Sequence, residues 1–337
     1  MTNKGTFANT QFSVLDLVPI ALGNSNLQSM QNSLDLARNA ENFGYKRFWV
    51  SEHHNTNSLV SSATVVLLGY LAQGTSTIRI GSGGVMLPNH APLIVAEQFG
   101  TLETLYPNRI DLGLGRAPGT DQLTAHALRR GKHESVQDFP NDIEELQTYF
   151  SIENQDGSVR AIPGEGLDIP IYLLGSSTFS AQLAARKGLP YAFASHFAPT
   201  HLKEALDLYK GGFTPSKYLD KPYAMACVNV FVADSDEEAE YLATSFYQMA
   251  LGIITNAREP LQPPVEDMDE IWNYQQQAMV KNMMYFTFKG TKETVEKELG
   301  EFIRTTGVDE VIVTSHIYDH QARIKSYRLL SELFNEK

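Results

Sequence analysis

An acidic residue and two histidines stand together at the end of a short apolar segment. The segment 46–50 is expected to be a strand, and it leads through Ser51 directly into Glu52, His53 and His54. A carboxylate and imidazoles can exchange protons with a substrate, bind a metal ion or hydrogen-bond the loop that carries them. Adjacent residues on an extended strand point to opposite sides, so we do not expect both histidines to face one metal ion.

Three further segments offer groups for a flat or anionic ligand. Residues 81–84 read Gly-Ser-Gly-Gly, which indicates either close approach of a flat ligand or a simple bulge. Arg116 follows the glycine-rich run 110–115, and arginine offers a planar donor fork that suits phosphate. Residues 174–181 place four hydroxyl side chains at the start of an expected helix. Free backbone N–H groups at such a helix start favour an anion, although the hydroxyls can also serve only as a helix cap.

The elements that must position these residues alternate along the chain. Short β-rich runs are separated by amphipathic stretches, a pattern typical of a parallel sheet whose crossovers are helices. The eight expected strands cover residues 12–18, 46–50, 78–81, 110–114, 171–174, 191–194, 226–233 and 311–313.

Eight such repeats predict a (β/α)8 TIM barrel that forms a single domain over residues 1–337. The main alternative is a doubly wound open sheet, but no G-x-G-x-x-G phosphate loop follows the first strand. Two insertions are expected. Polar helices and a loop follow strand four, and residues 251–288 follow strand seven. The second insertion is rich in proline, methionine and aromatic residues, and it is either an extra helix packed on the barrel or an active-site lid.

The composition argues against several classes of protein. The 337 residues include 27 Lys+Arg and 39 Asp+Glu, a net charge of −12, without the basic stripe that nucleic-acid binding requires. No apolar stretch is long enough to span a bilayer, so we expect no membrane partner. The single cysteine, Cys227, is expected to be a buried apolar side chain and cannot form an intrachain disulfide. These features together favour a cytoplasmic protein.

Several motifs occur together in a recognisable order. They are GYKRFWVSEHH at 44–54, GSGGVMLP at 81–88, NRIDLGLGRAPGTD at 108–121, and GTKETV at 290–295 followed by GVDE at 307–310. Together they resemble the bacterial-luciferase-like flavin monooxygenases, and the likeness spans almost the whole chain. It is strongest to a single-subunit branch of that family whose substrates are mostly unknown.

The resemblance implies a luciferase-type barrel that uses reduced FMN and O2. Such an enzyme would oxygenate an unidentified small organic substrate through a C4a-peroxyflavin. The resemblance also implies a separate NAD(P)H:flavin reductase that supplies the reduced flavin, and a homodimer. Bacterial luciferase has a reactive cysteine where this chain has Gly115, so light emission and a long-chain aldehyde substrate are not expected.

The resemblance also carries roles to particular residues by motif position. His53 matches the active-site histidine that transfers protons near the flavin, with Glu52 or His54 setting its orientation. Ser82 and Gly83 fall where the family has a non-prolyl cis peptide beneath the isoalloxazine. The residues expected to hold the FMN phosphate are Arg116, Arg129, Gly175, Ser176, Ser177 and Ser180.

Three other functions are compatible with these residues. The first is a flavin-binding protein of the same fold without turnover. The second is a deazaflavin-dependent reductase. The third is a metal hydrolase that uses His53, His54, His316 or His320, although these histidines lack the H-E-x-x-H pattern and no metal site is expected.

Overall fold

Eight parallel strands close into a barrel in the computed structural model, which describes residues 3–117, 119–129 and 137–335. Their bounds are β1 Gln11–Asp16, β2 Arg47–Val50, β3 Arg79–Ser82, β5 Ile110–Gly115, β6 Ile171–Gly175, β7 Tyr191–Phe193, β8 Ala224–Val232 and β10 Glu310–Thr314. Closure comes from β10, which pairs in parallel with both β1 and β8. The predicted barrel and its eight strands are therefore confirmed.

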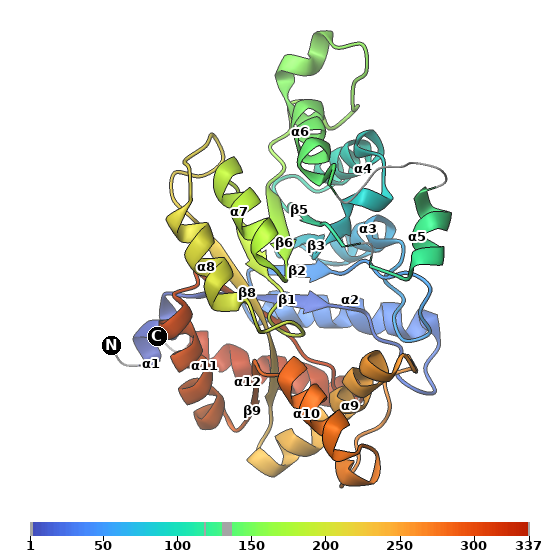
Figure 1. The fold of residues 1–337 in the computed structure, drawn as a ribbon, viewed down its shortest axis with the longest axis vertical. Coiled ribbons are helices and arrows are strands. Elements are labelled where there is room, and N and C mark those ends of the chain that lie inside the picture. Colours follow the sequence, from blue (N-terminus) through green and yellow to red (C-terminus); the bar gives the residue numbers. More distant parts are fainter. Residues whose placement is uncertain (1–2, 118, 130–136, 336–337) are drawn as a thin grey trace.

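Helices cover the outside of the barrel, as Figure 1 shows. Their bounds are α1 Asn3–Ala8, α2 Asn26–Asn42, α3 Thr64–Gly74, α4 Pro92–Leu105, α7 Thr178–Lys187, α8 Leu202–Gly211, α11 Lys292–Thr306 and α12 His320–Asn335. The sequence analysis missed α8, although it buries Leu202, Ala205, Leu206 and Tyr209 at helical spacing. None of the described helices has the length and continuous apolar sequence needed to cross a bilayer.

The excursion after β5 matches its prediction. It contains α5 Gln122–Arg129, α6 Phe139–Phe150 and the short 3-10 helix η2 Ile152–Asp156. The α6 helix packs against α4, and the loop beyond it projects from the barrel at the top of Figure 1. A short strand, β4 Val85–Met86, and the 3-10 helix η1 Leu87–Asn89 lie earlier, between β3 and α4.

The excursion after β8, expected at residues 251–288, shares its first residues with a helix. Residues 251–255 are the end of α9 Asp236–Thr255, which stops where Asn256 adopts a left-handed conformation. The excursion continues through η3 Met268–Glu270 and α10 Tyr274–Met283, and β9 Thr287–Gly290 pairs in parallel with the second half of β8. The helix α9 continues to Thr255, and β9 at the other end of the excursion has only four residues.

This excursion has its own apolar core beside the barrel. Phe246 from α9 packs with Trp272, Val280 and Met284, and Ile317 joins them from the loop after β10. Figure 1 shows α9 and α10 together at the bottom of the molecule. The segment therefore packs one further helix, α10, beside the barrel.

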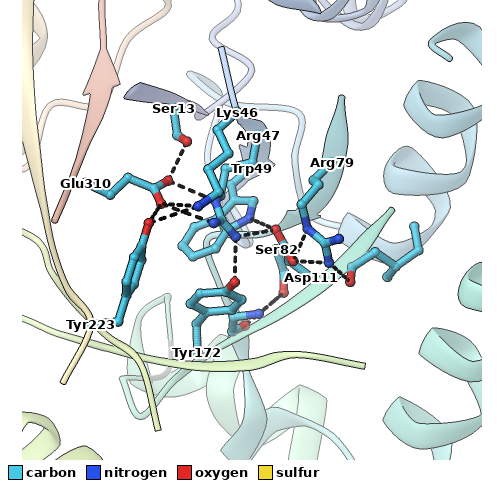
Figure 2. Close-up of polar contacts among 12 residues, drawn as sticks. Ser13, Lys46, Arg47, Trp49, Arg79, Ser82, Asp111, Tyr172, Tyr223 and Glu310 are labelled. Carbon is cyan, nitrogen blue, oxygen red and sulfur yellow. Dashed lines mark hydrogen bonds and ion pairs between the residues drawn. The ribbon is translucent and has the colours of Figure 1, made fainter. Parts of the chain in front are cut away.

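A buried ionic network fills the barrel near the amino ends of its strands (Figure 2). The Arg47 guanidinium lies 2.8 Å from Glu310 Oε1, 2.8 Å from Asp111 Oδ2 and 2.7 Å from the Tyr172 hydroxyl. Burial alone would lower the pKa of Arg47, but the two carboxylates hold it above its ordinary value. Burial and the charge of Asp111 raise the pKa of Tyr172 to about 12. Arg47 therefore stays charged and Tyr172 stays protonated.

An apolar layer lies above this network. Its buried members are Leu15, Trp49, Tyr172, Ala192, Met225, Cys227 and Ile312. Trp49 joins the two layers, since its indole N–H donates to Asp111 at 3.1 Å while its ring lines the cavity above. The barrel interior is thus packed below, and the space for a ligand lies at the carboxyl ends of the strands.

Candidate active site

One cavity of about 410 Å³ opens at the carboxyl ends of the barrel strands. Its wall includes His53 after β2, Arg116 after β5, His196 after β7 and His316 after β10. Active sites of (β/α)8 enzymes lie at this face because the loops after the strands converge there. The loops that follow β2, β3, β5 and β6 all contribute residues to this one cavity.

His53 is half-buried in the cavity wall. Its Nδ1 atom lies 3.0 Å from the Ser51 hydroxyl, which in turn lies 3.3 Å from the Ser61 hydroxyl. Burial, together with the nearby charge of Arg258, lowers the pKa of His53 to about 4. At neutral pH this imidazole is uncharged, so it can accept a proton or donate one through a hydrogen bond.

Glu52 and His54 point away from the cavity and toward each other. The Glu52 carboxylate accepts hydrogen bonds from His54 Nε2 at 2.9 Å, His90 Nε2 at 2.9 Å and the Met86 backbone N–H at 2.9 Å. Burial alone would raise the pKa of Glu52, but these bonds lower it to about 2. Neither Glu52 nor His54 lines the cavity, so the two residues fix loops rather than contact a ligand.

A backbone surface without side chains forms another part of the wall. Gly83 and Gly84 line the cavity and are joined by a cis peptide bond. A Cβ on Gly83 would lie 2.7 Å from Leu15 Cδ1, and one on Gly84 would lie 2.7 Å from the Gly113 carbonyl oxygen. At Gly84 the obstacle is backbone, so only glycine fits there, whereas a side chain at position 83 would have to displace Leu15. The two glycines leave bare backbone facing the cavity.

The cis bond was expected between Ser82 and Gly83 and lies one residue later, between Gly83 and Gly84. The Ser82 hydroxyl is fully buried behind the wall, where it donates to the Gly113 carbonyl at 2.8 Å and accepts from its N–H at 3.0 Å. Ser82 therefore supports the glycine surface and does not reach the cavity.

A corner suited to an anion lies between the ends of β5 and β6. The Arg116 guanidinium stacks on the Phe179 ring at 4.0 Å from its centre, which fixes its direction. Ser177 is the N-cap of α7, and its side chain makes no capping hydrogen bond. A Cβ on Gly175 would lie 2.7 Å from Ser180 Oγ, so glycine is needed to keep the turn open.

This corner combines a cation, hydroxyls and the free N–H groups of a helix start, which is a donor set that fits phosphate. Of the predicted phosphate ligands, Arg116, Gly175, Ser176, Ser177 and Ser180 all line the cavity. Arg129 ends α5, and its side chain lies outside the part of the chain that the structure describes.

Two more histidines line the cavity. His196 and His316 are 7% and 1% exposed, and the Nδ1 atom of each is buried without a hydrogen-bond partner among the described residues. Burial and the neighbouring His53 lower the pKa of His196 to about 3, and burial and Arg323 lower that of His316 to about 3. Both imidazoles are therefore neutral, like that of His53.

His196 was not predicted, although it stands two residues beyond the strand expected at 191–194, where a barrel places its functional groups. His316 was considered only as a metal ligand with His320. His320 instead starts α12 and contacts Asp35 at 2.9 Å through Nε2. Among the described residues, no three His, Cys, Asp or Glu side chains are placed to hold a metal ion.

Comparison with known proteins identifies the family. A family model described as luciferase-like monooxygenase matches residues 10–310. The chain belongs to the luciferase-like monooxygenase family. A luciferase-like monooxygenase of Escherichia coli (strain K12) is 50% identical over 325 residues, which are 96% of this chain and 97% of the relative.

Two other proteins support the same assignment. The N-acetyl-S-alkylcysteine monooxygenase of Bacillus subtilis (strain 168) is 34% identical over 334 residues, which are 96% of this chain and 97% of the relative. The solved structure of apo-MsnO8 matches with a TM-score of 0.86 and 33% identity, over 97% of this chain and 99% of that one. The family and the fold expected from the motifs are thus confirmed.

The site of this luciferase-like monooxygenase has three parts with different chemistry. These are the bare backbone of Gly83 and Gly84, the Arg116 corner with its donor set that fits phosphate, and the neutral imidazole of His53. Phe246 and Met249 from α9 and Met283 from α10 add an apolar wall. A phosphorylated flat molecule fits this combination of groups.

Proposed function

We propose that this luciferase-like monooxygenase uses reduced FMN and O2 to oxygenate a small organic substrate. The observation that carries the proposal is that one cavity joins a phosphate corner, a flat glycine surface and a neutral imidazole. FMN combines a terminal phosphate with a planar ring system. Reduced FMN, when bound, would supply the electrons and the reaction with O2.

The chain's own residues would bind and orient the cofactor. Arg116, Ser176, Ser177 and Ser180 would hold the phosphate at the start of α7, and the backbone of Gly83 and Gly84 would support the ring. The lowered pKa of His53 keeps its imidazole neutral, and its Nδ1 atom contacts Ser51. Its other nitrogen would then exchange a proton with the bound reactants.

The segment after β8 would shield the reaction from water. Ile253 and Met283 from this segment line the cavity, which supports the proposal that residues 251–288 cover the active site as a lid. An apolar cover keeps water from a reactive oxygen species and strengthens the polar contacts beneath it.

Two partners complete the proposal. A separate NAD(P)H:flavin reductase would supply reduced FMN. A second copy of the chain would form a homodimer over α3, where Val66 is 76% exposed and Tyr70 is 42% exposed. Large apolar side chains that gather on a helix surface are typical of contact surfaces between proteins.

The proposal is tested by titrating the protein with FMN and then with photoreduced FMN under anaerobic conditions before mixing with O2. Bound reduced flavin is expected to reoxidise with kinetics that differ from those of free flavin, and S-alkyl-N-acetylcysteines are a first substrate series because one relative is named for them. The oxygenase proposal fails if reoxidation matches that of free FMN. Tight FMN binding without oxygenation of any compound would favour a flavin-binding protein, and binding of a deazaflavin in place of FMN would favour the reductase.

A further inference from the structure

Arg258 is a cation that lines the cavity. It stands on the loop after α9, is exposed, and forms no hydrogen bond or ion pair with any residue that the structure describes. The positive charge of Arg258 acts on the cavity, since it contributes to the lowered pKa of His53.

The backbone around Arg258 is fixed at both ends. On one side the Ala257 N–H donates to the Gly252 carbonyl at 2.8 Å, just after Asn256 ends α9. On the other side Leu261 forms a parallel bridge to Ala21, in the loop after β1. The Leu261 N–H donates to the Ile20 carbonyl at 2.7 Å. The guanidinium is therefore carried over the cavity by an ordered turn.

The charges of the cavity indicate what Arg258 would bind. Arg116 is the other arginine in its wall, and the proposed function assigns Arg116 to the phosphate of FMN. The three cavity histidines are neutral, so they offer no competing positive charge. Glu259 also lines the cavity beside Arg258, and its negative charge opposes a ligand with two negative charges more strongly than a ligand with one.

The surfaces between Arg258 and the deep histidines are mainly apolar. Phe246, Met249 and Ile253 of α9 and Met283 of α10 form this wall. Methionine side chains adapt to varied apolar shapes. A substrate that fills this space would have an apolar body and would meet the Arg258 guanidinium at the loop after α9.

We infer that Arg258 binds a carboxylate of the substrate, so that the substrate is an organic acid with an apolar body. This inference rests on the proposed function, because it assigns the other half of the cavity to FMN. A guanidinium binds a carboxylate through two parallel hydrogen bonds and pairs with one negative charge.

The test compares 4-phenylbutanoate with 4-phenylbutanamide, which differ in charge but little in shape. Their affinities are measured by calorimetry on the protein with and without FMN. The wild type is expected to bind the carboxylate about tenfold more tightly than the amide. Arg258→Met should abolish this preference and Arg258→Lys should keep part of it, whereas Arg186→Met, an exposed arginine on α7 outside the cavity, should leave it unchanged.

FMN titration of the same variants separates this inference from the proposed function. Unchanged FMN affinity in Arg258→Met, with loss of the carboxylate preference, supports the inference. A parallel loss of FMN affinity would mean that Arg258 serves the flavin and would overturn it. Equal affinity for both probes, no binding of either probe, or a preference that survives Arg258→Met also overturns it. Failure of the wild type to bind FMN defeats the proposed function, while the comparison of the probes is still measurable.

Discussion

The Glu52 carboxylate lies 2.9 Å from the backbone nitrogen of Met86, and this hydrogen bond joins the loop after β2 to the loop after β3. The first loop carries His53 and the second carries the cis Gly83–Gly84 bond. The Nε2 atoms of His54 and His90 both contact the Oε1 atom of the same carboxylate, each at 2.9 Å. Glu52 thus sets the position of the imidazole relative to the glycine surface without contacting the cavity.

Glu52→Gln is expected to reduce stability in a pH-dependent way. The folded pKa of Glu52, about 2, is lower than its ordinary value. Its ionised form therefore stabilises the fold above the unfolded pKa of about 4.3, and this contribution is lost as pH falls toward 2. The shift corresponds to about 3 kcal/mol in the free energy of unfolding. Urea unfolding between these pH values should show a steeper loss for the wild type than for the variant.

The exposed Glu298 on α11 provides the control for that measurement. Glu298→Gln should follow the wild-type pH dependence. If Glu52→Gln also follows it, the carboxylate does not contribute to stability in the way that its contacts indicate.

Arg47→Met should be strongly destabilising. It removes the cation that Asp111 and Glu310 share inside the barrel and leaves two buried carboxylates without it. Breaking a buried ion pair from one side costs about 3–5 kcal/mol. Chemical denaturation measures the loss. Arg328→Met, which removes a surface pair with Glu332, should cost less than about 1 kcal/mol, and similar losses for both variants would contradict this account.

Arg116→Met should weaken binding of FMN but not of riboflavin. The guanidinium would contact the phosphate that riboflavin lacks, and hydrogen bonds to charged groups contribute about 1.5–3 kcal/mol. We therefore expect FMN affinity to fall about 10- to 100-fold in fluorescence titrations. An equal effect on riboflavin would place Arg116 elsewhere in the binding site.

The histidines allow the charge of Arg258 to be measured directly. NMR titration of the wild type should give His53 a pKa of about 4, because burial and Arg258 both disfavour the imidazolium. Arg258→Met should raise that pKa toward the ordinary value of about 6.5. Because the folded pKa is lowered, this imidazole opposes folding increasingly as pH falls from about 6.5 to about 4. An unchanged pKa in the variant would remove Arg258 from the surroundings of His53.

Gly84→Ala should lower the free energy of unfolding and weaken flavin binding. Its Cβ would lie 2.7 Å from the Gly113 carbonyl oxygen, so the backbone of either β5 or the glycine surface must shift. The control is Gly211→Ala at the end of α8, where a Cβ would meet nothing within 4 Å. That variant should be neutral or more stable by up to about 1 kcal/mol. Equal behaviour of the two variants in thermal unfolding would count against the tight fit at Gly84.

The sequence predicted the barrel because each strand and most helices carry their own local pattern. The polar residues at strand ends could also be predicted, since the fold brings all of these ends to one face. His53 lines the cavity whereas Glu52 and His54 do not. This difference follows from the alternation of side chains along an extended chain. The same alternation could have shown that Glu52 and His54 lie opposite His53.

Other features depend on contacts between distant segments, which local patterns do not reveal. Arg258 lies over the cavity because Leu261 pairs with Ala21, and no periodicity in either segment indicates this bridge. The strand β9 is short and defined by its pairing with β8. The cis bond at Gly83–Gly84 was misplaced by one residue because three glycines within 81–84 offer nearly equivalent positions.

The attachment of the segment after β8 restricts how ligands can enter the cavity. It is fastened at its start by α9, in its middle by the bridge between Leu261 and Ala21, and at its end by β9. A segment attached at three points is not expected to move as one rigid body about a single hinge. We expect ligands to enter through local movement of the loops between these attachment points. The length of those loops would then limit the size of the compounds that can reach the cavity.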